Sequence, residues 1–131
     1  MATERELIDL AVSMLDRAYI PYSHFPVGAA LECADGAVFT GCNIENSSYG
    51  LTLCAERTAA VKAVSEGHTR FARIVIAGNS EDFCYPCGAC RQFLYEFGPD
   101  MQVICLNAAR EAKHMTLKEL LPCGFDQTWL R

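Results

Sequence analysis

Pro86-Cys87-Gly88-Ala89-Cys90-Arg91-Gln92 is the stretch around which the sequence is organised, and it belongs with Cys54-Ala55-Glu56 upstream. Together the two segments form a C-x-E…P-C-x-x-C pattern, which supplies three thiolates and one carboxylate. A structural zinc site is closed by four protein ligands, whereas a catalytic site keeps one position open for water. Three cysteines beside a carboxylate that is not needed as a ligand therefore predict a hydrolytic zinc site.

The spacing of these residues also predicts where they lie on their helices. Successive helical residues are rotated by about 100°, so Cys54 and Glu56 would point apart in mid-helix. Both reach one metal only if Cys54 lies at a helix N-terminus, where free N–H groups favour a thiolate. Cys87 and Cys90 are three residues apart, so a first helical turn presents both on one side. We therefore predict two helix N-termini that converge on one metal.

The remaining elements alternate after an initial hairpin. Thr3 and Glu6 fit a capping box for a first helix, which should end before Pro21, and Asp35-Gly36 predicts a hairpin turn. The order predicts a three-layer α/β/α sandwich with a mixed sheet of roughly five strands. The expected strands are 27–34, 37–45, 71–77, 101–106 and a short edge strand within 108–115, and the later helices are 54–66, 88–97 and a short one from the Thr116–Glu119 capping box to Pro122.

Composition limits the function classes. The 131 residues are 51% hydrophobic and 21% charged, as in ordinary globular proteins, and we expect one domain over residues 1–131. The net charge of −5 without a basic run argues against nucleic-acid binding, which needs Lys and Arg to neutralise phosphates. The N-terminus has no apolar signal core and no apolar run could span a bilayer, so we expect a cytoplasmic protein without membrane contact.

Cysteine use points to metal chemistry. Without a signal peptide, the eight cysteines favour metal or catalytic use over disulfides. Those outside the motifs are interpreted as small hydrophobic core residues: Cys33, Cys42, Cys84, Cys105 and Cys123.

Two further segments carry candidate ligand groups. Phe25, in a loop between two prolines, fits either a stacking platform for a planar ligand or a core aromatic. His24 fits either a hydrogen-bonded structural residue or a metal ligand. Strand alternation puts Asn43 and Glu45 on one face, where they could hold a pair of hydroxyls such as those of a ribose or simply end a solvated strand.

At this point the chain resembles the cytidine deaminase family, in its small homotetrameric form, over nearly its whole length. The matching segments are Pro21–Ala30, Gly41–Asn46, Cys54–Ala59, Pro86–Gln92, and Leu120–Pro122 followed by Phe125. Ser47 stands where the family often has alanine, and Tyr85 and the additional Cys84 depart mildly from its pattern.

The resemblance implies a role for each matched residue. One zinc ion per chain would be held by Cys54, Cys87 and Cys90, with Glu56 as the catalytic proton shuttle. Substrate contacts would come from Phe25, Asn43, Glu45, Ser47, Tyr49, Ala55 and Phe125, of which Tyr49 and Phe125 would reach a neighbouring subunit's site. The implied enzyme is a cytidine deaminase of pyrimidine nucleoside salvage, which converts cytidine and 2′-deoxycytidine to uridine and 2′-deoxyuridine with release of ammonia, through a zinc-activated water.

The all-cysteine ligand set raises an electrostatic question. Zinc with three thiolates carries a formal charge of −1, which weakens it as a Lewis acid. Arg57 and Arg91 each follow a motif residue directly, and either could donate hydrogen bonds to a thiolate or be a surface charge. The resemblance points to Arg57.

Three other functions are alternatives to cytidine deamination. A blasticidin-type deaminase shares the metal motifs, but Asn43, Glu45 and Phe25 favour cytidine. Cys84 could instead close a structural zinc site as a fourth thiolate, and Cys87-Gly88-Ala89-Cys90 resembles a dithiol oxidoreductase motif. Neither of the last two explains Cys54-Ala55-Glu56.

Overall fold

The computed structural model describes residues 1–130, in which one mixed sheet has the strand order β2-β1-β3-β4-β5. β1 pairs antiparallel with both β2 and β3, β3 pairs parallel with β4, and β5 returns antiparallel to β4. The parallel pair is joined by the crossover through α3, as parallel neighbours require. The strands are β1 (Val27–Cys33), β2 (Val38–Cys42), β3 (Phe71–Gly78), β4 (Gln102–Leu106) and β5 (Ala112–Thr116).

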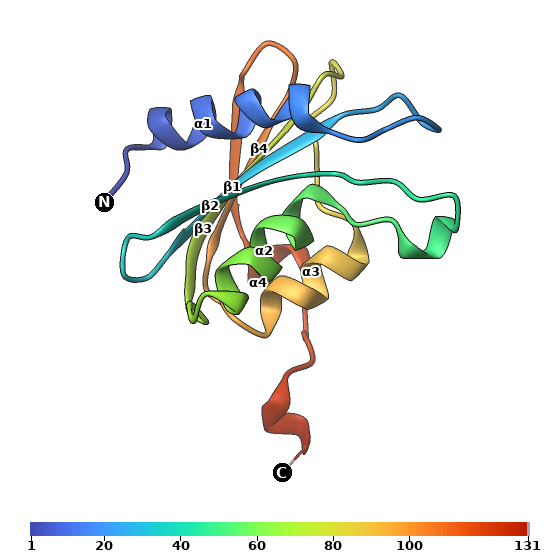
Figure 1. Ribbon diagram of the computed structural model, residues 1–131. Helices are drawn as coiled ribbons and strands as arrows, with labels where there is room; N and C mark the ends of the chain where they lie inside the picture. The colour runs from blue at the N-terminus through green and yellow to red at the C-terminus, as the bar shows by residue number, and fades with distance from the viewer. Residues whose placement is uncertain (131) are drawn as a thin grey trace.

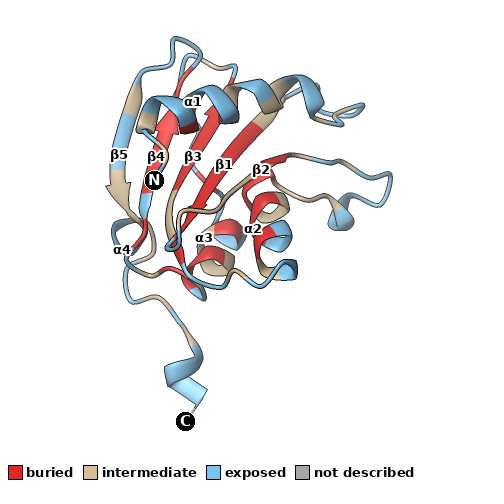
Figure 2. Ribbon diagram, turned by 60° about the vertical axis from the view of Figure 1, so that its left-hand side comes forward, coloured by how far each residue is buried: buried red, intermediate tan, exposed pale blue. Residues whose placement is uncertain are grey.

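Helices cover both faces of this sheet, which confirms the predicted three-layer α/β/α arrangement (Figure 1). α1 lies alone on one face, while α2, α3 and α4 share the other (Figure 2). The helices are α1 (Glu4–Ser13), α2 (Ala55–Ser65), α3 (Gly88–Tyr95) and α4 (Leu117–Leu120), with 3₁₀ turns at Met14–Arg17, Tyr49–Leu51 and Gln127–Leu130. None of the helices within residues 1–130 is long and apolar enough to cross a membrane.

The strands supply one core to each face because successive side chains point to opposite sides of a sheet. In β3, Val75 and Ala77 pack with Leu7 and Ala11 of α1. Ile74 and Ile76 face the other way, into the larger core beneath α2 and α3. This alternation explains why the central strands are apolar at nearly every position.

Two glycines let the helices approach the sheet closely. A Cβ on Gly28 would lie 2.1 Å from the carbonyl oxygen of Ala11, and one on Gly41 would lie 2.3 Å from that of Ala55. Side chains at these positions would therefore push α1 and α2 off the sheet. Because Ala55 begins α2, Gly41 sets the distance between the sheet and the first turn that carries Glu56.

Most predicted boundaries are confirmed. Both capping boxes form, with Thr3 and Thr116 as the N-caps, and Cys54 and Cys87 are the N-caps of α2 and α3. The predicted strand 37–45 is too long, because it ends at Cys42 and the following residues pair with other segments.

Candidate metal centre and cavity

Three cysteine side chains come together where α2 and α3 begin. Cys54 and Cys87 are N-cap residues, and Cys90 lies in the first turn of α3. Their sulfur atoms all lie within 4.8 Å of one another, with 3.8 Å between Cys54 and Cys87 and 3.5 Å between Cys87 and Cys90. The sequence prediction that two helix N-termini converge on one site agrees with this arrangement.

This sulfur cluster fits a zinc ion. Zn–S bonds of about 2.3 Å in a tetrahedron place the sulfurs about 3.8 Å apart, close to the observed separations. Within residues 1–130 the group that could hold a metal consists of these three cysteines, and Cys84 is not part of it. The geometry therefore leaves a fourth position for water, as in a catalytic site.

The electrostatics of the cluster favour a thiolate at Cys54. The pKa of Cys54 is lowered to about 5, chiefly by a hydrogen bond from the Cys90 thiol and then by Arg57. The pKa of Cys90 is raised because its thiol donates that bond and because it is buried. A metal ion would take the place of the shared proton.

Glu56 lies beside the sulfurs without belonging to their cluster. It is 4% exposed in the first turn of α2. Burial raises its pKa to about 7, and the nearby Cys54 adds to the increase. A carboxyl that titrates near neutral pH is suited to accept and return a proton.

The two candidate arginines differ in what they bind. Arg57 donates from Nη2 to the Cys54 sulfur at 3.4 Å and to the Thr52 carbonyl at 3.4 Å. Arg91 donates instead to the carbonyl oxygens of Pro86 at 2.7 Å and Leu120 at 2.9 Å. Of the two, Arg57 is the one bonded to a thiolate, while Arg91 braces the loop before Cys87.

A cavity of about 190 Å³ opens onto the cluster. Its wall includes Glu56 and two cysteines of the cluster, together with the candidate substrate residues Phe25, Asn43 and Ala55. Its lining residues are Phe25, Val27, Asn43, Thr52, Leu53, Cys54, Ala55, Glu56, Cys84, Tyr85 and Cys87.

Asn43 and Glu45 hold the loop that carries Phe25. Asn43 accepts from the Val27 N–H at 2.9 Å and donates to the Phe25 carbonyl at 2.8 Å. Glu45 accepts from the backbone N–H groups of Tyr22 and Ser23 at 3.0 and 3.1 Å and from the Ser23 hydroxyl. Sequence reasoning missed these bonds, which position Phe25 at the cavity.

Glu45 faces an adjoining hollow. That hollow is also lined by Tyr22, Ser23, Tyr49 and Thr52, and Thr52 is shared with the cavity at the thiolates. The pair predicted to hold ribose hydroxyls therefore lines two neighbouring spaces, with Asn43 in one and Glu45 in the other. Hydrogen bonds with Ser23 contribute most to holding the pKa of Glu45 below its usual value.

Besides Glu45, three other predicted contact residues do not line the cavity at the thiolates. The Ser47 hydroxyl lies 2.5 Å from that of Tyr22, and Tyr49 packs edge-on against Tyr22. Tyr49 and Phe125 are 73% and 50% exposed. His24 is not part of the metal cluster, and its positive φ of 58° is that of a turn residue.

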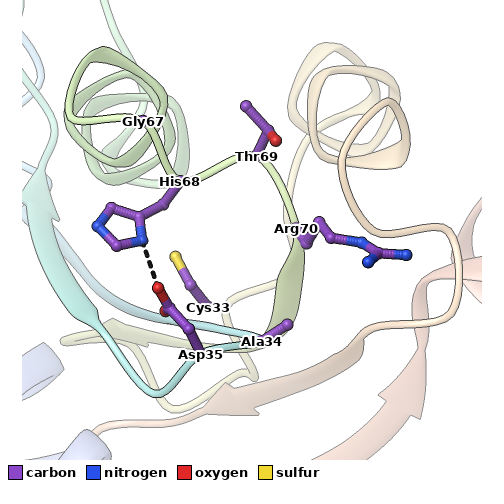
Figure 3. Close-up of a pocket in the computed structure, with 7 residues that line it drawn as sticks. All are labelled: Cys33, Ala34, Asp35, Gly67, His68, Thr69 and Arg70. Carbon is purple, nitrogen blue, oxygen red and sulfur yellow. Dashed lines mark ion pairs between the residues drawn. The ribbon is translucent and has the colours of Figure 1, made fainter.

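A second cavity, of about 180 Å³, lies at the opposite end of β1 (Figure 3). Asp35 and His68 form an ion pair of 2.9 Å beside it. Cys33 lines it, but this thiol is 1% exposed and burial raises its pKa to about 11. Cys33 is therefore a core residue, as predicted, and not a nucleophile. The same prediction is wrong for Cys123, which is exposed.

Comparison with known proteins also indicates a zinc-binding deaminase. Residues 1–107 match the family model described as "Cytidine and deoxycytidylate deaminase zinc-binding region". A Dictyostelium discoideum protein named "Probable cytidine deaminase" is 53% identical over 121 residues, which are 92% of this chain and 82% of that protein. The cytidine deaminase of Sporosarcina psychrophila is 47% identical over 113 residues, 86% of this chain and 83% of the relative.

A solved structure and a more distant relative complete the comparison. The crystal structure of cytidine deaminase from Burkholderia pseudomallei has a TM-score of 0.91 and 44% identity, and the match covers 95% of this chain and all of that one. Blasticidin-S deaminase from Bacillus cereus is 30% identical over 130 residues. The sequence is thus nearer to these cytidine deaminases than to that enzyme.

Proposed function

The chain belongs to the cytidine and deoxycytidylate deaminase family, and we propose that it hydrolyses cytidine and 2′-deoxycytidine to uridine, 2′-deoxyuridine and ammonia. The observation that carries this proposal is the buried Glu56 beside three converging cysteine sulfurs in one cavity. A family zinc-binding region and an open thiolate cluster together support a hydrolytic metal centre rather than a structural one.

Cys54, Cys87 and Cys90 would hold one zinc ion per chain. Bound there, zinc would lower the pKa of water towards about 7 and so provide a nucleophile at neutral pH. Glu56 would take one proton from the water as its oxygen attacks C4 and would pass that proton to N3. It would then take the proton of the new hydroxyl on C4 and give it to the amino group, which leaves as ammonia. A carboxyl whose pKa is raised to about 7 can perform both directions of this transfer.

The other cavity residues would orient the nucleoside. The Phe25 ring packs against the base, on a loop that Asn43 and Glu45 fix in place. An amide nitrogen has two protons, and Asn43 uses one on the Phe25 carbonyl, which leaves the other for a ribose oxygen. Ala55 begins α2, so its backbone N–H has no helical partner and can reach the base.

Assembly would complete the site. Ser47, Tyr49 and Phe125 are absent from the lining of this chain's own cavity, and Tyr49 and Phe125 expose much of their rings. We propose that these residues meet the cavity of a neighbouring subunit in a homotetramer. We propose further that residues 1–131 form a single deaminase domain. It would act in the cytoplasm in nucleoside salvage, without nucleic-acid or membrane partners.

Zinc content and turnover in one preparation test the function. We expect about one zinc per chain and release of uridine and ammonia from cytidine, with blasticidin S a much poorer substrate. Zinc without turnover of any cytosine nucleoside would favour a structural site. Preferred turnover of blasticidin S would replace the proposed substrate.

A further inference from the structure

Tyr85 is a cavity residue whose hydroxyl is held by a lysine of the edge strand. Its ring lines the cavity at the thiolates and is 43% exposed. Its hydroxyl accepts a hydrogen bond from Lys113 Nζ at 2.9 Å. The ammonium also lies 5.9 Å from the ring centre of Phe83, within the range of cation–π attraction.

The backbone around Tyr85 is fixed on both sides. Cys84 donates its N–H to the Leu106 carbonyl at 3.0 Å, and the following Pro86 restricts Tyr85 to extended conformations. Arg91 holds the Pro86 carbonyl at 2.7 Å. With the main chain anchored, the direction of the ring depends on what holds its hydroxyl.

Lys113 reaches this hydroxyl from the edge strand. It lies directly opposite Cys105 in the β4–β5 pairing, and opposite residues point to the same face of a sheet. Cys105 belongs to the core beneath α2 and α3, so Lys113 projects on the side where the cavity lies. The bond joins residues 28 positions apart.

Two segments of the cavity wall meet at the thiolates, while Phe25, Val27 and Asn43 line the rest of it. Thr52 to Glu56 form one, and Cys84, Tyr85 and Cys87 form the other. During deamination C4 faces the metal centre, so the ring atoms N3 and C5 flank it. Glu56 must reach N3, which turns N3 towards the first segment and C5 towards the second.

We propose that Tyr85, oriented by Lys113, forms the wall against the C5 edge of the pyrimidine and so determines which 5-substituted cytosine nucleosides are accepted. This assignment rests on the proposed function. Tyr85 acts as a specificity-determining wall, and Lys113 is a positioning residue that acts only through the Tyr85 hydroxyl.

Cytidine and 5-methylcytidine are the substrates that test it. Tyr85→Ala should raise the ratio of kcat/KM for 5-methylcytidine to that for cytidine by about 10-fold or more, since one methyl group is typically worth 10–200-fold in a closed pocket. Tyr85→Phe and Lys113→Met should each raise the ratio less and by equal amounts. Because they remove the same bond, the double variant should match either one.

Binding of uridine and 5-methyluridine, measured by calorimetry, gives a readout that needs no turnover and should change in the same order. Lys118→Met, which removes an exposed lysine paired with Asp100 at 2.8 Å, is the matched control and should leave both ratios unchanged. Tyr85→Phe and Lys113→Met preserve the test if Tyr85→Ala fails to fold.

Two results would overturn the assignment. If the wild type is active and Tyr85→Ala leaves the ratio of kcat/KM for 5-methylcytidine to that for cytidine unchanged, Tyr85 does not form the C5 wall. If the effects of Tyr85→Phe and Lys113→Met on this ratio are additive, Lys113 does not act through the Tyr85 hydroxyl. Zinc-loaded wild type that leaves cytidine intact would instead refute the proposed function itself, and this inference with it.

Discussion

Arg57→Ala tests whether the chain compensates for its all-cysteine ligand set. Arg57 reaches the Cys54 sulfur at 3.4 Å, and its buried Nε has no hydrogen-bond partner among the described residues. The guanidinium therefore gives up some solvation to lie against a thiolate. It should draw negative charge from the sulfur and keep the metal centre a stronger Lewis acid.

The structure sets the size of the effect. One hydrogen bond to a charged group contributes about 1.5–3 kcal/mol, and each 1.36 kcal/mol is tenfold in rate. We therefore expect Arg57→Ala to lower kcat by about 10–100-fold, the usual range for partners of metal ligands. KM should change less, because the charge acts during the chemical step.

Steady-state kinetics and zinc content, measured on the same samples, separate the possible outcomes. Arg5→Ala, which removes an exposed arginine of α1, controls for the loss of one positive charge. Cys54→His in the Arg57→Ala background should restore part of kcat, because it removes one negative charge at the metal. A change in KM alone, or simple additivity of the two substitutions, would refute charge compensation by Arg57.

Three further outcomes follow from the geometry. Cys84→Ser should keep zinc stoichiometry and activity nearly unchanged, since Cys84 is outside the sulfur cluster; metal analysis showing lost zinc would indicate a closed structural site. Gly41→Ala should destabilise the fold by about 1–3 kcal/mol and lower activity by displacing α2, whereas Gly50→Ala, with open space around its Cβ, should do neither in melting and rate measurements. Glu32→Gln should cost about 3 kcal/mol at neutral pH because it leaves Arg73, 2.8 Å away, without its buried partner. Burial opposes ionisation of Glu32, but bonds from Arg73 and the Ala2 N–H outweigh it and hold its pKa below the usual value. The stability it contributes is therefore present above its ordinary pKa and lost as pH falls through the lower folded value, so wild type and Glu32→Gln should converge in urea unfolding at acid pH.

Local chemistry explains what could be predicted from the sequence. The capping residues Thr3 and Thr116 act within one helical turn, so a short pattern identifies them. The requirement that Cys54 and Glu56 both face one metal site placed Cys54 at a helix start, where it lies. Hydrophobic runs marked the central strands because both faces are covered.

Long-range contacts explain what could not be predicted. The alternation at Asn43 and Glu45 suggested a strand, but Ile44 pairs with both Leu53 and Tyr19, which no local pattern indicates. The sequence could not show which arginine binds a thiolate, because Arg91 is instead bonded to the carbonyl oxygens of Pro86 and Leu120. The bond between Lys113 and Tyr85 joins an edge strand to a distant loop.

The activity of Glu56→Gln, measured together with its zinc content, shows directly whether the buried carboxyl carries protons in the reaction. The amide keeps the size of the side chain but cannot carry a proton between water, N3 and ammonia. We predict full zinc, an unchanged melting temperature and a kcat lower by at least about 10²-fold, as for the loss of a general acid–base group. Turnover within a few-fold of wild type would contradict the account, because the buried carboxyl would then have no part in the reaction.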